Sequence, residues 1–184
     1  MKYFLWFRKP TKFVFYNLVL LVFIFILPNH CTIKFPLLFD VVDLFIKNFG
    51  WLFIIFIRIF YLFATKSSFK ALRLIALEIL FYIINTSRGG FINLLTTEKL
   101  NISGHIFMFS FSSYLLLEII NDNNVPAKGI AMCVLAIYNI LACVTIMVYH
   151  GRIECLIGFV IAILFSLMHY FYISLLNNLN CCIL

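Results

Sequence analysis

The amino-acid sequence predicts an all-α, polytopic membrane protein: one domain over residues 1–184, six transmembrane helices, and amino and carboxyl termini in the cytosol. Hydrophobic residues make up 65% of the 184 positions and charged residues only 11%, and the mean hydropathy is +1.10. The apolar residues gather in six runs that are limited by charges, Pro, Asn or Gly. So few charged residues cannot cover a water-soluble surface, and the chain therefore belongs in a bilayer.

The six apolar runs set the expected spans at 13–27, 49–64, 71–86, 102–120, 129–149 and 153–176. A hydrocarbon core of about 30 Å takes about 20 helical residues, so we expect the first three runs to recruit flanking residues or to tilt little. The first run follows a basic segment, as in a signal peptide, but residues 28–31 offer no small-residue cleavage site. We expect this run to be retained as the first span.

Lysine and arginine are divided unevenly between the two sides of these spans. One side holds eight, namely Lys2, Arg8, Lys9, Lys12, Lys66, Lys70, Arg73 and Lys128. The other side holds five, namely Lys34, Lys47, Arg88, Lys99 and Arg152. Because the more basic side faces the cytosol, both termini are expected there. Basic residues beside apolar runs meet anionic lipid head groups, so the net charge of +7 does not indicate a nucleic-acid partner.

Two histidines fall on the same, non-cytosolic side of the predicted bundle. His105 follows Ser103 and Gly104 at the start of the fourth span, whereas His150 lies between the fifth and sixth spans, four residues before Glu154. A different number of spans between them would have placed them about 30 Å apart. The topology therefore permits one shared site.

The residue types in this site suit chemistry on a phosphate ester at a membrane surface. Ser103 can cap the fourth helix, whose first amides and dipole attract an anion, and Gly104 leaves room for that anion. His105 can protonate a leaving oxygen, while His150 attacks phosphorus or activates water. Glu154 at i+4 can hold the ring of His150 in the required tautomer.

Phosphoryl transfer also needs a positive partner, because negative charge develops on the phosphate oxygens. Arg152, two residues after His150, is the first candidate to bind the substrate phosphate, followed by Lys99 and Arg88. An equally simple interpretation of each is that it reaches the membrane interface and nothing more. The sequence shows no Asp/Glu cluster and no His pair at i+4, so we expect chemistry without a metal or another cofactor.

The remaining polar residues of the spans are expected to be structural. Arg58 and Glu78 lie at similar depth in the second and third runs, which predicts an ion pair. Glu118 lies about 20 Å beyond His105 along a helix and is expected at the cytosolic interface. His30 and His169 lack partners of the kind that His150 has. The six cysteines show no metal or redox spacing, and no disulfide framework is expected.

Two segments carry a resemblance to a known family. Residues 101–107 read Asn-Ile-Ser-Gly-His-Ile-Phe, and with Glu118 thirteen positions after the histidine they resemble a helix signature of the fat storage-inducing transmembrane (FIT) proteins. The second segment has His150 followed by Glu154 at +4 and Gly158 at +8, which is similar to that family's second signature. The resemblance runs from about residue 12 to residue 173.

The resemblance implies an endoplasmic reticulum membrane protein, related to lipid phosphatases, whose active site faces the lumen. It implies a hydrolase that cleaves fatty acyl-CoA to acyl 4′-phosphopantetheine and adenosine 3′,5′-bisphosphate, and that acts in lipid droplet biogenesis, phospholipid metabolism and lipid homeostasis of that membrane. His105 and His150 would be catalytic, with Ser103, Gly104 and Glu154 in support. Fatty acyl-CoA, membrane lipids, diacylglycerol and triacylglycerol would be the partners.

Alternatives remain open at this point. Asn101 and Cys155 stand where the family often has Asp and Lys, which puts substrate selection in question. A lipid phosphate phosphatase or a sphingolipid head-group transferase is the enzymatic alternative, although the transferases carry Asp where this chain has Glu154. A non-catalytic protein that binds di- or triacylglycerol and promotes droplet budding is a second class. A transporter is a weaker third, because no span shows a regular polar stripe or paired broken helices.

Overall fold

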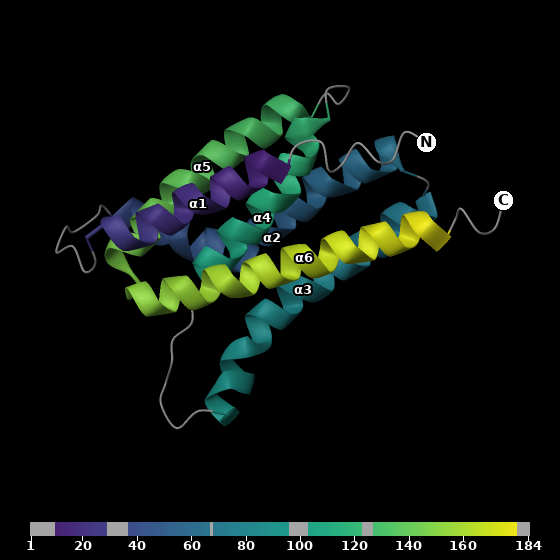
Figure 1. The fold of residues 1–184 in the computed structure, drawn as a ribbon. Coiled ribbons are helices and arrows are strands. Elements are labelled where there is room, and N and C mark those ends of the chain that lie inside the picture. Colours follow the sequence, from purple (N-terminus) through teal and green to yellow (C-terminus); the bar gives the residue numbers. More distant parts are fainter. Residues whose placement is uncertain (1–9, 29–36, 67, 96–102, 123–126, 180–184) are drawn as a thin grey trace.

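The computed structural model describes residues 10–28, 37–66, 68–95, 103–122 and 127–179, and the elements within these ranges are all helices. Figure 1 shows them in chain order. They are α1 (Pro10–Ile26), α2 (Leu37–Thr65), α3 (Ser68–Leu95), α4 (Gly104–Asn121), α5 (Lys128–Val148) and α6 (Arg152–Leu179). The all-α expectation is confirmed for this part of the chain.

The second and third helices are longer than their apolar runs. α2 has 29 residues and begins at Leu37, well before residue 49, and α3 has 28 residues and continues to Leu95, past residue 86. Both helices thus recruit flanking residues, as expected for apolar runs that are short for a bilayer. A helix continues for as long as its backbone groups remain paired, and polar or charged residues in its flanks do not by themselves end it.

Two of the described helices are long and apolar enough to cross a membrane, namely Lys128–Val148 and Arg152–Leu176. Shorter apolar helical stretches cover Asn17–Ile26 and Phe49–Thr65. Large apolar side chains are also exposed along α6, namely Val160, Leu164, Leu167, Met168 and Phe171. An outer surface of this kind suits contact with hydrocarbon or with another apolar surface better than contact with water.

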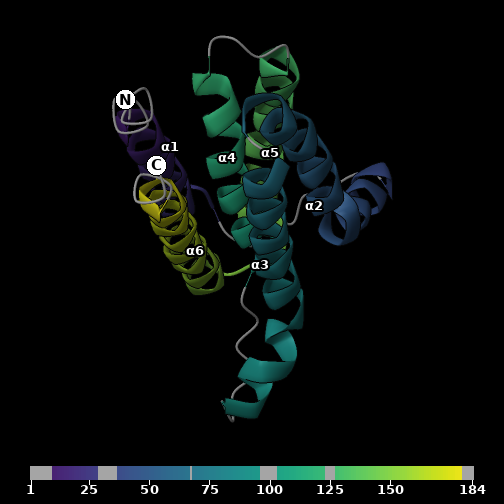
Figure 2. The same cartoon turned by 90° about the vertical axis from the view of Figure 1, so that its right-hand side faces the viewer.

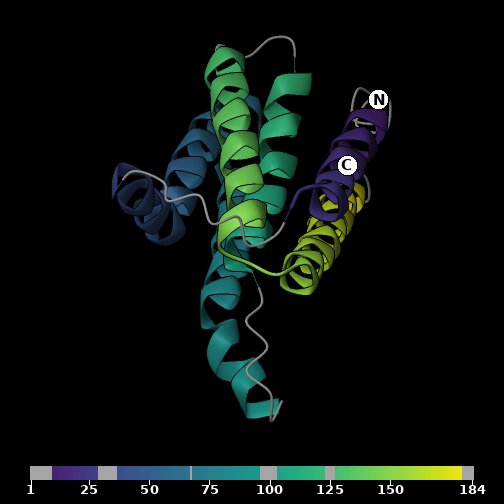
Figure 3. The same ribbon diagram turned by 90° about the vertical axis from the view of Figure 1, so that its left-hand side faces the viewer.

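α4 is the central helix of the fold. It contacts each of the other five helices, and the views in Figures 2 and 3 place it between α5 on one side and the α1 and α6 pair on the other. All of its side chains from His105 to Ile120 are buried. A helix that is apolar all round belongs in the interior, and this position lets α4 present residues to several neighbours.

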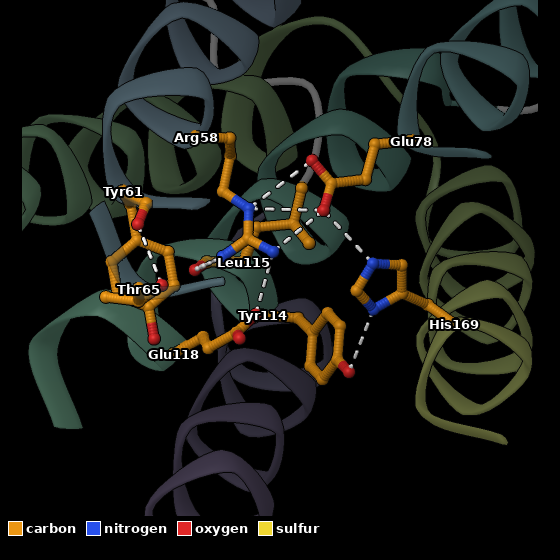
Figure 4. A network of polar contacts seen from close by, with 8 residues as sticks. All are labelled: Arg58, Tyr61, Thr65, Glu78, Tyr114, Leu115, Glu118 and His169. Carbon is orange, nitrogen blue, oxygen red and sulfur yellow. Dashed lines mark hydrogen bonds and ion pairs between the residues drawn. The ribbon is translucent and has the colours of Figure 1, made fainter. Parts of the chain in front are cut away.

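Four polar side chains from four helices meet beside α4, and we call them the buried ion cluster: Arg58 of α2, Glu78 of α3, Glu118 of α4 and His169 of α6 (Figure 4). The Arg58 Nη2 atom lies 2.8 Å from Glu78 Oε1 and 2.8 Å from Glu118 Oε2. The Nε2 atom of His169 lies 3.0 Å from Glu78 Oε1. The predicted pairing of Arg58 with Glu78 is confirmed.

Two expectations about this cluster are wrong. Glu118 does not lie at an interface: it is 5% exposed and paired with Arg58. His169 is not without partners, since its Nδ1 atom also lies 3.2 Å from the hydroxyl of Tyr114. Spacing along one helix cannot show which groups other helices bring to the same depth.

Candidate functional site

The start of α4 is organised by Ser103. Its side chain accepts a hydrogen bond from the amide of Ile106, at 3.3 Å, which makes Ser103 the predicted N-cap. The amide of Ser103 donates to the carbonyl oxygen of Glu154 on α6, at 3.2 Å. The amides of Ser103 and Ile106 therefore already have partners within the protein. They are not available to the anion that was expected at the start of α4.

The first turns of α6 lie directly against this cap. A Cβ atom on Gly158 would lie only 2.4 Å from the carbonyl oxygen of Ser103, so this close approach of two backbones requires glycine. The side chain of Cys155 is fully buried and lies close to that of Ser103. α4 and α6 therefore start side by side, and both run away from the site in the same direction.

The structure brings the two predicted histidines together. The Nδ1 atom of His105 lies 3.4 Å from the Nε2 atom of His150, and the ring centroids are 5.6 Å apart. The Nδ1 atom of His150 lies 3.1 Å from Glu154 Oε2. The predicted proximity of His105 and His150 and the predicted contact of His150 with Glu154 are confirmed.

These contacts determine the roles of the ring nitrogens. Because an ionised carboxylate only accepts hydrogen bonds, the proton of His150 lies on Nδ1 and is donated to Glu154. The Nε2 atom of His150 then carries a lone pair that faces His105, whose Nδ1–H can donate to it. The result is a hydrogen-bonded series of a carboxylate and two imidazoles, in which His150 Nε2 is the basic atom.

Glu154 also has a structural role that the sequence analysis missed. The amide of Gly151 donates to Glu154 Oε2 at 3.1 Å. Glu154 is the third residue of α6, and a Glu at that position commonly bonds to the amide that precedes the helix. The three-residue spacing from Gly151 to Glu154 was the available signal for this contact. The helix start thus fixes the carboxylate that orients His150.

The three side chains of the site differ in their exposure to solvent. His105 is 4% exposed, whereas the side chains of His150 and Glu154 are 15% and 28% exposed. A substrate that approaches from solvent therefore reaches His150 first, with His105 beneath it. No group of three or more His, Cys, Asp or Glu that could hold a metal is found in the described part of the chain.

The structure describes the side chain of only one of the predicted cations. Arg152 is the first residue of α6, two positions after His150, and its side chain is exposed. Arg88 lies within α3, but its side chain is outside the described residues, as are Lys99 and His30 altogether. No predicted cation is thus shown in contact with the histidines.

The chain was compared with known proteins at three levels. No model of a protein family, no curated protein sequence and no solved structure matches it.

Proposed function

We propose that this chain is a membrane hydrolase that cleaves the diphosphate anhydride of fatty acyl-CoA, giving acyl 4′-phosphopantetheine and adenosine 3′,5′-bisphosphate. The observation that carries the proposal is the series His105, His150 and Glu154, with distances of 3.4 and 3.1 Å between successive side chains. The resemblance to FIT proteins supplies the substrate. It also supplies the endoplasmic reticulum, the lumenal face of the site and the role in lipid droplet biogenesis and membrane lipid homeostasis.

The proposed reaction has two steps. In the first, neutral His150 attacks one phosphorus of the diphosphate through Nε2, the bridging P–O bond breaks, and the leaving oxygen takes a proton from His105, which reacts as the imidazolium and becomes neutral. In the second, water attacks the phosphohistidine, the P–N bond breaks, and the water proton returns to His105. Glu154 stabilises the positive charge that develops on His150 while its Nε2 atom is bonded to phosphorus.

Substrate binding has to part the two imidazoles. A reacting phosphorus stands about 3 Å from its nucleophile, and the leaving oxygen lies within about 3 Å of its acid. In-line attack therefore needs the two nitrogens about 5–6 Å apart, more than the observed 3.4 Å. His150 lies in the short connection between α5 and α6, while His105 is buried within α4, so His150 is the residue that moves.

The surroundings of the site suit a charged head group on an apolar tail. Arg152 is exposed beside His150 at the start of α6, where both the guanidinium and the helix dipole favour an anion. Lys99 is proposed for the same role on the sequence alone. The apolar outer surface of α6 suits the acyl chain and membrane lipid. This arrangement belongs with a six-span topology, with both termini cytosolic and the histidine pair lumenal.

The decisive assay compares hydrolysis of oleoyl-CoA by the purified protein in lipid nanodiscs with that of His105→Ala and His150→Ala. Each substitution is expected to lower kcat by about 10²–10⁴-fold, because each removes a proton-transfer or nucleophilic group. Cys133→Ala, at an exposed position on α5, is the matched control and should keep the wild-type rate. A phosphohistidine trapped in the wild type should be lost in His150→Ala.

Equal rates in the wild type and both histidine variants would contradict the hydrolase. That result would leave the second candidate, a non-catalytic protein that binds diacylglycerol or triacylglycerol, which the apolar exposed side chains favour. A lipid phosphate phosphatase would use the same pair of histidines. Faster release of phosphate from phosphatidate than cleavage of oleoyl-CoA would indicate that activity instead.

Topology is tested separately. Protease-cleavable tags inserted at residues 96–102 and 149–151 should both be protected in sealed microsomes, because both connections are proposed to face the lumen. Cleavage of only one tag would place the two histidines on opposite sides of the membrane and would contradict the shared site.

A further inference from the structure

The buried ion cluster links the two helices that carry the candidate site. Arg58 joins α2 to α3 through Glu78 and to α4 through Glu118. His169 joins α6 to α3 through Glu78, at 3.0 Å, and to α4 through the hydroxyl of Tyr114, at 3.2 Å. In Figure 4 these side chains converge from four helices, with His169 lying between Glu78 and Tyr114.

α4 and α6 are thus hydrogen-bonded to one another at two levels. At the site, the amide of Ser103 bonds to the carbonyl of Glu154. At the cluster, Tyr114 bonds to His169. The second level lies about 16 Å farther along α4 and about 22 Å farther along α6, at 1.5 Å per residue. Contacts at two different levels restrain both the sliding and the rotation of one helix against the other, whereas a contact at one level would still allow the helices to pivot about it.

Polar contacts are the groups that can set this register. A bilayer is as apolar as the helix surfaces, so burial of Leu or Phe does not distinguish one helix register from the next. The outer face of α6 near His169 is apolar, with Leu167 and Met168 exposed. A buried charge, in contrast, is strongly unfavourable unless its partner is in place, and a shift of α4 or α6 by one turn, about 5.4 Å, separates the pairs that this helix makes in the cluster.

We propose that Glu118 and His169 of the buried ion cluster are positioning residues, which hold α4 and α6 in the register that brings His105 to His150. The kinetic test of this role rests on the proposed function, whereas the test of the helix register does not. The register itself can be measured without turnover.

The register is measured with a disulfide between α4 and α6. The side chains of Ser103 and Cys155 lie close together, and disulfide geometry tolerates only small displacements. In a chain whose other cysteines are replaced by alanine, Ser103→Cys is oxidised mildly in nanodiscs. The loss of thiols that react with N-ethylmaleimide after denaturation is then followed by mass spectrometry.

Four substitutions are compared in this background. His169→Leu and Glu118→Leu remove cluster contacts and should slow disulfide formation at least about tenfold, because disulfide geometry tolerates only small displacements of the two helices. His169→Gln keeps a donor for Glu78 and should restore most of the rate. Met168→Leu, at an exposed neighbouring position on α6, is the matched control and should cross-link like the parent.

The kinetic readout uses the same four substitutions in the wild-type background. In His169→Leu and Glu118→Leu, kcat for oleoyl-CoA should fall about 10- to 100-fold, with KM little changed, because a displacement of about 1 Å in a catalytic group has an effect of this size. A cluster that only stabilises the fold would lower the amount of folded protein and leave kcat per folded molecule intact.

The outcomes separate the two proposals. Folded His169→Leu and Glu118→Leu proteins that cross-link at the parent rate would overturn the positioning role, whatever their turnover. A Ser103→Cys parent that cross-links as expected, beside a wild type that hydrolyses nothing, would overturn the proposed function alone. If the leucine variants do not fold, Tyr114→Phe decides, because it removes only the hydroxyl that contacts His169. Unchanged cross-linking and kcat in Tyr114→Phe would then count against the proposal.

Discussion

Replacing Gly158 with alanine tests how closely α6 must approach α4. The added Cβ atom would lie 2.4 Å from the carbonyl oxygen of Ser103, whereas ordinary contact begins at 3.4 Å, so one backbone must move by about 1 Å. Because both groups belong to helix backbones or their caps, no side-chain rotation can relieve the overlap. The displaced residues include Ser103, which precedes His105, and Glu154, which holds His150.

The expected magnitude follows from two opposing terms. Overpacking of this kind destabilises a protein by about 1–3 kcal/mol, while alanine is favoured over glycine inside a helix by about 0.5–1 kcal/mol. Gly129→Ala on α5 is the matched control, because its added Cβ atom meets nothing within 4 Å. The difference in unfolding free energy between the two variants therefore isolates the overlap.

The assay combines unfolding in detergent micelles with turnover of oleoyl-CoA. Gly158→Ala should unfold more easily than Gly129→Ala, and its kcat should fall by about 100-fold, as for a catalytic group displaced by about 1 Å. Gly129→Ala should keep the wild-type kcat. If the two variants behave alike in both measurements, the close approach of α6 to Ser103 is not what positions the site, and the reasoning is refuted.

Three further predictions concern single contacts. Glu154→Gln should lower kcat by up to about 10⁴-fold, with little change in unfolding, because it no longer stabilises the required tautomer of His150; an unchanged kcat would remove Glu154 from the mechanism. Ser103→Ala should lower the unfolding free energy by about 0.5–2 kcal/mol and Ser103→Thr by less, so equal losses would argue against capping. Arg58→Leu and Glu78→Leu should each destabilise the fold by about 3–5 kcal/mol in a thermal scan, and an intact fold in Arg58→Leu alone would show that pairing is the wrong account.

Contacts between residues close in the chain were predictable from the sequence. The cap at Ser103 follows from a small hydroxyl residue before an apolar helix, and the contact of His150 with Glu154 follows from a spacing of four residues. The depth of Arg58 and Glu78 predicted their pairing, because consecutive antiparallel helices place equal depths side by side. The ends of α2 and α3 were not predictable, since the apolar runs mark the expected membrane span and not the end of backbone pairing.

The sequence by itself determined that the chain is helical and apolar, and that two histidine segments could share a face. Only the tertiary structure decided that His105 and His150 lie within 3.4 Å, that Arg58 takes Glu118 as a second partner, and that His169 joins Glu78. The reason is physical: periodicity and spacing govern contacts within one helix, whereas the rotation and sliding of one helix against another depend on contacts between distant residues. In a chain as apolar as this one, the hydropathy pattern does not distinguish those arrangements, and a few buried polar groups do.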